Sequence, residues 1–391
     1  MLERFGRETK GLPVTTSISS PLLAAPGAVP PPDDSPDLGV PWHYGDPFAE
    51  QRTAARGAVV VDRSHRTVLA VPGEERLSWL HLLLSQHVSA LPDGTGTEAL
   101  VLDGQGRVEA HMVLAHLDGT VWLDTEASST VTGAIGGRTE SLLGYLEGMR
   151  FWSKVEPQDV SADWALLSVL GPDAGRVLAS VGVPVPAEKY AVTALAGGGL
   201  VRRMPWPGPD AVDLLVPRSE LVSWWERLTD AGARRAGSWA FEALRVESFR
   251  PRQGMDTDNR SIPHELGWIP SAVHVSKGCY RGQETVSKVH NVGKPPRRLL
   301  LLHLDGSSEV LPETGDPVTS GDRVVGRVGS VIRHHELGPV ALALIKRSVP
   351  IDAELTVGAE DRQIAGSIDP DSVPVDTGEP PGRVAAQRLR G

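Results

Sequence analysis

Alternating and periodic apolar positions divide the chain into the elements of a mixed α and β protein. Apolar runs at residues 58–61 and 68–71 have the length and composition of short buried strands. Apolar residues then recur at helical spacing through residues 77–88, after two glutamates that suit the positive end of a helix. The pattern therefore predicts two strands followed by an amphipathic helix.

The next region predicts an antiparallel meander. Runs at residues 99–102, 108–117 and 121–124 are separated by Asp103-Gly104 and Asp118-Gly119. Asp-Gly between β-rich runs favours tight hairpin turns, so the three runs are expected to pair in sequence. A helix around residues 140–149 closes this unit.

A similar order recurs between residues 154 and 250. It comprises strands at 165–170, 200–204 and 211–216, a helix containing Trp224 and Trp225, and a helix over 238–249. Both halves contain a strand, a Gly/Pro turn, a helix and antiparallel strands. That order is typical of an α+β fold rather than of a doubly wound sheet.

The pattern changes at Arg297, where short strands and Gly-rich turns follow at regular spacing. The predicted strands are 299–304, 317–320, 323–332, 340–344 and 354–357. They indicate a small all-β barrel over residues 297–367, appended to a core of residues 41–296. The Pro-rich segments 1–40 and 368–391 have no apolar period and are predicted to be disordered tails.

Composition excludes several classes of protein. The 391 residues carry a net charge of −10 and contain one cysteine, and no apolar run reaches the roughly 18 residues that span a membrane. One cysteine excludes an intramolecular disulfide and favours a reducing, cytoplasmic location. It also excludes a four-thiolate cluster held by a single chain. Motifs for nucleotide-binding loops, serine hydrolases and zinc proteases are absent, and we expect no metal site.

The single thiol lies in the segment Lys277-Gly278-Cys279-Tyr280-Arg281-Gly282-Gln283-Glu284. Lys277 and Arg281 are expected to lower the pKa of the Cys279 thiol by stabilising the thiolate. The two glycines would let a flat ligand or a partner approach the backbone closely. The alternative is a buried structural cysteine beside ordinary surface charges.

These eight residues resemble the Lys-Gly-Cys-Tyr-x-Gly-Gln-Glu signature of the YgfZ family. The likeness continues in Asp62-Arg63-Ser64-His65 and in Leu170-Gly171-Pro172, which resemble motifs of the related glycine-cleavage T-protein (aminomethyltransferase). The resemblance implies a T-protein-like α+β core, with two related subdomains around a central folate cavity and a C-terminal barrel. It also implies a role in the maturation or repair of iron–sulfur proteins, with tetrahydrofolate as the cofactor.

The resemblance implies roles for several residues. Cys279 and Lys277 would carry the chemistry, and Tyr280, Gln283 and Glu284 would contact the cofactor. Asp213 would hydrogen-bond the pterin, although an aspartate in a strand is more often solvent-facing. Arg245 would pair with the folate glutamate tail. The alternative for Arg245 is an ion pair with Glu242, three residues earlier on the same helix.

The sequence departs from the T-protein at an Asp-Asp pair that aminomethyl transfer requires. The overlay of the Gly-rich hairpins places Ala110 and His111 at those positions. Without the carboxylate, the folate amine loses its electrostatic partner, so glycine-cleavage activity is not expected. A folate-dependent one-carbon transferase or demethylase remains the alternative function.

A basic stretch follows the thiol. Six cations between Lys277 and Arg298 face one acid, Glu284. The stretch could meet a folate polyglutamate tail, an acidic client protein or RNA, or it could be a solvated loop. An accessory protein of tRNA modification is therefore a third, lower alternative. The leading hypothesis is a cytoplasmic folate-binding protein that assists iron–sulfur client proteins.

Overall fold

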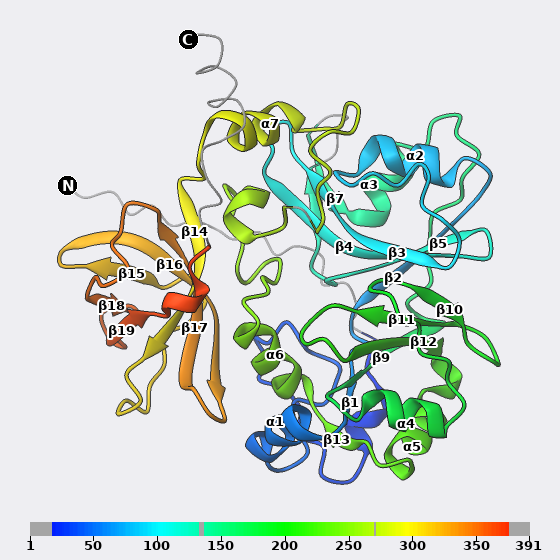
Figure 1. The fold of residues 1–391 in the computed structure, drawn as a ribbon, viewed down its shortest axis with the longest axis horizontal. Helices are drawn as coiled ribbons and strands as arrows, with labels where there is room; N and C mark the ends of the chain where they lie inside the picture. The colour runs from blue at the N-terminus through cyan, green and yellow to red at the C-terminus, as the bar shows by residue number, and fades with distance from the viewer. Residues whose placement is uncertain (1–17, 133–136, 270, 375–391) are drawn as a thin grey trace, which may run out of the picture.

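Two sheets and a closed barrel make up the structure, a computed structural model that describes residues 18–132, 137–269 and 271–374 (Figure 1). The two sheets lie one above the other on the right of Figure 1, and the barrel lies to the left. This is the predicted α+β core with a small C-terminal barrel. Within the described ranges, no helix is long and apolar enough to cross a membrane.

The first sheet has the strand order β3-β4-β5-β2-β8. Its strands are β2 (Thr67–Pro72), β3 (Thr95–Leu102), β4 (Val108–Leu117), β5 (Thr120–Thr125) and β8 (Gln158–Asp159). Ala110, Met112 and Leu114 alternate along β4 and pack in one core with α2 (Arg76–Leu83) and α3 (Leu142–Gly148). Because successive side chains of a strand point to opposite faces, Glu109 and His111 lie on the other face, away from this core. The short pair β6 (Thr130–Thr132) and β7 (Thr139–Ser141) lies beside α3.

The second sheet has the order β10-β11-β12-β9-β1-β13. Its strands are β1 (Val59–Asp62), β9 (Trp164–Leu170), β10 (Val192–Ala194), β11 (Leu200–Met204), β12 (Ala211–Pro217) and β13 (Arg234–Ala236). Val60 packs in the core that includes residues of α4 (Ala174–Ser180) and α5 (Leu221–Asp230). Val59 and Val61 pack on the opposite face, where α1 (Pro47–Arg56) and α6 (Ser238–Glu247) contribute to the core. The sheet is therefore covered by helices on both faces, which explains why β1 is apolar at every position but its last.

The partner of β1 was not predicted. β1 is joined to β2 of the first sheet by only four residues, yet it pairs antiparallel with β9 and parallel with β13 in the second sheet. The link Arg63–Arg66 between β1 and β2 therefore crosses from one sheet to the other. This crossing places the Asp62-Arg63-Ser64-His65 motif at the junction of the two subdomains.

The barrel begins at Arg297, where the sequence pattern changes. Its strands are β14 (Arg297–Leu304), β15 (Pro317–Ser320), β16 (Arg323–His334), β17 (Gly338–Lys346), β18 (Leu355–Val357) and β19 (Ile364–Ile368). Leu300 and Leu302 of β14 fill the barrel core, whereas Leu299 and Leu301 pack outward against the rest of the protein. Alternate leucines of one continuous run thus pack in two different hydrophobic cores. β19 and the helix α7 (Gln283–Val292) were not predicted.

The N-terminal prediction of disorder is wrong for the described part of that segment, residues 18–40. Ser20 donates a hydrogen bond to Asp62 at 2.5 Å, and Asp37 lies 2.8 Å from the Arg252 guanidinium. These contacts are made by single polar residues rather than by a periodic apolar face, so the composition gave no sign of them. Residues 1–17 lie outside the described residues. At the other end, Asp369 pairs with His303 at 2.8 Å, and residues 375–391 lie outside the described residues.

Candidate functional site

A central cavity lies where the two subdomains meet. It encloses about 480 Å³ of space between atoms, part of it continuous with solvent. Its wall combines arginines, carboxylates, histidines and two aromatic rings: Asp37, Arg63, His65, Arg66, His111, Glu126, Trp206, Ser238, Phe241, Glu242, Arg245, Pro251, Arg252 and Gln253. The side chains come from the N-terminal segment, the β1–β2 link, β4, α6, the segment that follows α6, and the residues just after β5 and β11.

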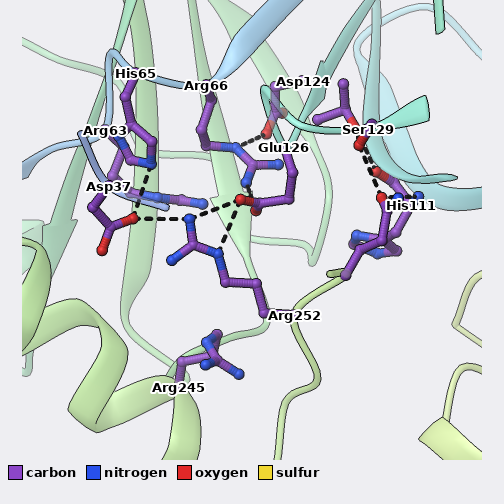
Figure 2. A network of polar contacts seen from close by, with 12 residues as sticks. Asp37, Arg63, His65, Arg66, His111, Asp124, Glu126, Ser129, Arg245 and Arg252 are labelled. Atoms are coloured by element: carbon purple, nitrogen blue, oxygen red, sulfur yellow. Dashed lines mark hydrogen bonds and ion pairs between the residues drawn. The ribbon is translucent and has the colours of Figure 1, made fainter. Parts of the chain in front are cut away.

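A buried network of guanidinium and carboxylate groups forms much of this wall (Figure 2). Arg66 donates to Asp124 at 2.9 Å and also to Glu126. Arg252 donates to Glu126 at 2.7 Å and forms an ion pair with Asp37 at 2.8 Å. Burial raises the pKa of Asp124, but the neighbouring arginines outweigh it and lower that pKa to about 2. The pKa of Glu126 is likewise held well below its usual value against burial, by Arg252 and Arg66. The network is therefore ionised at neutral pH.

Arg63 is the least neutralised guanidinium in the wall. Only its Nη1 has partners among the described residues, Ser168 at 3.2 Å and Asp213 at 3.6 Å. Its Cζ lies 4.0 Å from the centroid of the Phe241 ring, a cation–π contact. Burial lowers the pKa of Arg63 to about 10. A buried cation with uncommitted N–H groups in a cavity wall is suited to bind an oxygen of a ligand.

Asp213 lies one layer behind Arg63 and does not line the cavity. Its two carboxylate oxygens accept from Ser168 at 2.6 Å and from Arg202 at 2.8 Å. The side chain is buried, contrary to the solvent-facing alternative. Asp213 therefore holds Arg63 and Arg202 in place here, and the predicted pterin contact has no counterpart in this geometry.

Arg245 lines the cavity, but its guanidinium is already bound. It donates to Glu242 at 2.7 and 3.0 Å, to Asp256 at 3.0 Å and to Ser330 of β16 at 2.6 Å. The ion pair with Glu242 is the alternative that the helical spacing allowed. Arg245 thus joins α6 to the barrel, and its predicted role at a folate tail would require the loss of these bonds.

Cys279 is exposed and is not among the residues that line the cavity. The alternative of a buried structural thiol is therefore wrong, and the thiol is not part of the cavity wall. Tyr280, next to it, is buried in the core between the first sheet and the barrel. Gln283 donates to the Lys277 carbonyl at 3.0 Å, and Glu284 is exposed on α7. None of these three predicted cofactor contacts lines the cavity.

The two glycines of the thiol segment differ. Gly282 has φ +81°, and a Cβ there would lie 2.6 Å from the Asp103 carbonyl oxygen and from the Gly106 Cα. The close approach that Gly282 permits is therefore made by a hairpin of the same chain and not by a ligand. A Cβ on Gly278 would meet nothing within 4 Å.

Lys277 connects the segment around Cys279 to the end of α2. Its Nζ donates to the carbonyls of His81, Leu84 at 2.6 Å and Gln86 at 3.1 Å. These carbonyls lie at and just beyond the C-terminal end of α2, where they have no partners within the helix. The helix ends at Leu83 instead of continuing to residue 88 as predicted. Burial lowers the pKa of Lys277 to about 8, which leaves the amine mostly protonated at neutral pH. Its three bonds indicate a structural role in place of the predicted catalytic one.

One strand connects the thiol segment to the cavity. Arg281 donates to Glu109 of β4 at 3.2 Å, and Gln253 of the cavity wall donates to the Glu109 carbonyl at 2.6 Å. Two residues along β4, His111 lines the cavity. Ala110 points into the core of the first sheet, so His111 is the member of the Ala110-His111 pair that faces the cavity.

Sequence reasoning missed Asp37, Arg63, Arg66 and Arg252 as members of the cavity wall. Only Arg63 stood in a motif that had been singled out. Its neighbours in the wall come from separate segments with no shared spacing. Among the described residues, no group of three His, Cys, Asp or Glu side chains is arranged to hold a metal ion.

Matches to two family models assign the chain to a known family. Residues 38–277 match the GCVT N-terminal domain, and residues 297–380 match the C-terminal β-barrel domain of CAF17. The chain belongs to the GCVT-domain family and carries a CAF17-type barrel.

Relatives of this chain include aminomethyltransferases. One from Nitrosococcus oceani is 30% identical over 59% of this chain and 62% of its own length. Another, from a Nostoc species, is 27% identical over 81% of this chain and 85% of its own length. The structure of glycine cleavage system aminomethyltransferase T from Bartonella henselae superposes with a TM-score of 0.76. It is 20% identical over 90% of this chain and 96% of that chain, which shows the shared fold.

Replacement of Lys277 by methionine tests its structural role. K277M leaves three carbonyls at the end of α2 without their donor, so we expect the free energy of unfolding to fall by about 2 kcal/mol or more. Lys288→Met, on an exposed position of α7, is the matched control and should change it by less than about 0.5 kcal/mol. Urea unfolding measures both. Equal stability of K277M and the wild type would contradict the structural role.

The charge network predicts acid sensitivity. The folded pKa of Asp124 is about 2, below its unfolded value of about 3.9. The unfolded chain therefore binds more protons between these values, and stability falls as the pH falls through that window. Asp124→Asn should be less stable than the wild type at pH 6, and this difference should narrow from pH 4 toward pH 2. Urea unfolding at stepped pH checks it, and a constant difference would show that Asp124 does not titrate as described.

Proposed function

We propose that this protein binds a folate in its central cavity and assists the assembly or repair of iron–sulfur proteins through Cys279, as a YgfZ-type member of its family. The observation that carries the proposal is the position of the thiol. The only sulfur nucleophile is exposed outside the cavity, on a loop held by Lys277 and Gly282. A thiol in that place is available to another protein. Because one thiolate cannot hold a cluster, any cluster contact is shared with the partner or transient.

The chemistry of the cavity supports a folate as the ligand. Its wall combines aromatic rings with polar groups, as is usual for small-molecule sites. Trp206 and Phe241 offer flat apolar surface, Arg63 offers N–H donors to a ligand oxygen, and Glu126 and Glu242 are carboxylates suited to an aminopyrimidinone edge. Aminomethyltransferases of this family are folate-dependent. When bound, the folate would supply a carrier for a one-carbon unit.

A folate-dependent one-carbon transferase is the second candidate, and the names of the relatives favour it. Against it stands the pair Ala110-His111, of which one member is in the core and the other is an imidazole. The cavity therefore lacks a carboxylate at this place. This candidate predicts turnover of an amine-linked methyl or aminomethyl donor with tetrahydrofolate as the acceptor.

RNA binding through the basic stretch is supported less well. Lys277 is bound to carbonyls, Arg281 to Glu109, and Arg297 to Asp258 and Glu265. Arg298 donates to the Val349 carbonyl at 3.1 Å. At least four of the six cations are thus bound within the chain, and a cation held in this way is less available to phosphate groups. The cytoplasmic location suggested by the single cysteine stays a prediction.

Tetrahydrofolate titration tests the cavity. We expect micromolar or tighter binding by calorimetry under anaerobic conditions, and about tenfold weaker binding by Arg63→Met, because the ligand oxygen loses a charged donor. Arg176→Met, on the exposed side of α4, is the control and should bind like the wild type. The absence of wild-type binding at high-micromolar ligand would remove the folate half of the proposal.

The thiol is tested in cells that lack the protein. Cys279→Ser should bind tetrahydrofolate with unchanged affinity in vitro, because the thiol is outside the cavity. The activities of iron–sulfur enzymes should nevertheless stay at the level of the deficient cells. Ser276→Ala, an exposed neighbour on the same loop, should restore these activities like the wild type. Full restoration by C279S would overturn the role of the thiol.

A further inference from the structure

The cavity wall contains one histidine whose orientation is fixed on almost every side. The Nε2 of His111 lies 2.8 Å from Glu98 Oε2, and its ring stacks on Trp268 with centroids 4.9 Å apart and planes 8° from parallel. Its backbone N–H donates to Gln253 at 3.0 Å, and its carbonyl accepts from Thr125 at 2.7 Å. Among the described residues, Nδ1 alone has no hydrogen-bond partner. His111 lines the cavity, so Nδ1 is the ring nitrogen that is left for a ligand.

Glu98 decides which nitrogen of His111 carries the proton. It is fully buried, and besides His111 it accepts from Arg250 at 2.6 Å, from Trp206 Nε1 at 3.0 Å and from the Tyr190 hydroxyl. Burial raises the pKa of Glu98, but the His111 hydrogen bond and the Arg250 charge outweigh it and lower that pKa to about 2. An ionised carboxylate only accepts hydrogen bonds. Nε2 therefore carries a hydrogen toward Glu98, and in the neutral form of the ring Nδ1 is then an acceptor.

The carboxylate acceptors in the wall are different in kind from His111. Asp37, Glu126 and Glu242 are carboxylates, and each is already paired with Arg252. They suit the aminopyrimidinone edge of a pterin, which presents several N–H groups in every oxidation state. A neutral, single acceptor suits an isolated ring N–H instead.

We infer that His111 selects folates whose pyrazine ring is reduced, and that Glu98 sets this selectivity by holding the proton on Nε2. The inference rests on the proposed folate function. In tetrahydrofolate the two ring nitrogens of the reduced half carry hydrogen and can donate to Nδ1. In folic acid the same nitrogens have bare lone pairs, which would face the lone pair of Nδ1 with no hydrogen between them. A site built to accept from an N–H group rejects an analogue that lacks it, since the acceptor is left unpaired.

The affinity ratio of tetrahydrofolate to folic acid, measured by calorimetry, is the test. We expect the wild type to prefer tetrahydrofolate by roughly tenfold to a hundredfold. Glu98→Gln puts an amide, which can also donate, opposite Nε2, so the His111 proton is free to move to Nδ1 and the ratio should fall toward one. Glu109→Gln, on the same strand but directed to Arg281, is the matched control and should keep the wild-type ratio.

A second variant keeps the inference testable if E98Q does not fold. His111→Gln places a group that both donates and accepts at the same position, and the ratio should fall in the same way. ¹⁵N NMR of His111 in the wild type should show a protonated Nε2 and an unprotonated Nδ1. The opposite tautomer, or a full preference retained in both E98Q and H111Q, would overturn the inference, because ring shape alone would then explain the selectivity. Equal binding of both folates by the wild type would overturn this inference alone, whereas no binding of either would overturn the proposed function with it.

Discussion

Buried arginines impose the constraint on which this structure depends. A guanidinium removed from water without a carboxylate partner costs several kcal/mol. Arg66, Arg202, Arg245 and Arg252 are all buried, and each is paired with at least two carboxylates. The partners come from the N-terminal segment, the end of β5, β12, α6 and the loop after α6. The charges are satisfied only when these segments are assembled together, so the network fixes how the two sheets face one another.

The chemistry of the cavity depends on the polar groups that the ion-pair network does not bind. Much of the wall is neutralised internally, because Arg66, Arg245 and Arg252 pair with carboxylates. Arg63 keeps uncommitted donors, since Asp213 lies 3.6 Å from its Nη1 and shares its other oxygen with Arg202. His111 keeps one lone pair, since Glu98 takes its other nitrogen. A ligand therefore meets the Arg63 donors and the His111 acceptor beside carboxylates that are already paired with arginines, and a small number of such groups can make a cavity selective.

Local patterns predicted the strands well, because turns and alternation are short-range properties. The Asp103-Gly104 and Asp118-Gly119 turns set the β3–β4–β5 meander, and the change at Arg297 marked the barrel. Pairing between distant segments was not predictable. The apolar run of β1 does not indicate that it pairs with β9 and β13. The Pro-rich composition of the N-terminal segment likewise does not indicate the contacts of Ser20 and Asp37. For the same reason the motif around Cys279 identified a special segment without showing that Lys277 points to α2 and the thiol to solvent.

The cavity and the thiol are separate in space but share one strand. Glu109 and His111 lie on the same face of β4, and the first holds Arg281 of the thiol segment while the second lines the cavity. Gln253 contacts the backbone of both residues, which ties this part of β4 to the cavity wall. A ligand in the cavity would contact this wall and not the sulfur, so under the proposed function Cys279 meets a partner that approaches from outside. If a folate occupies the cavity, β4 is the strand that links it to the thiol segment.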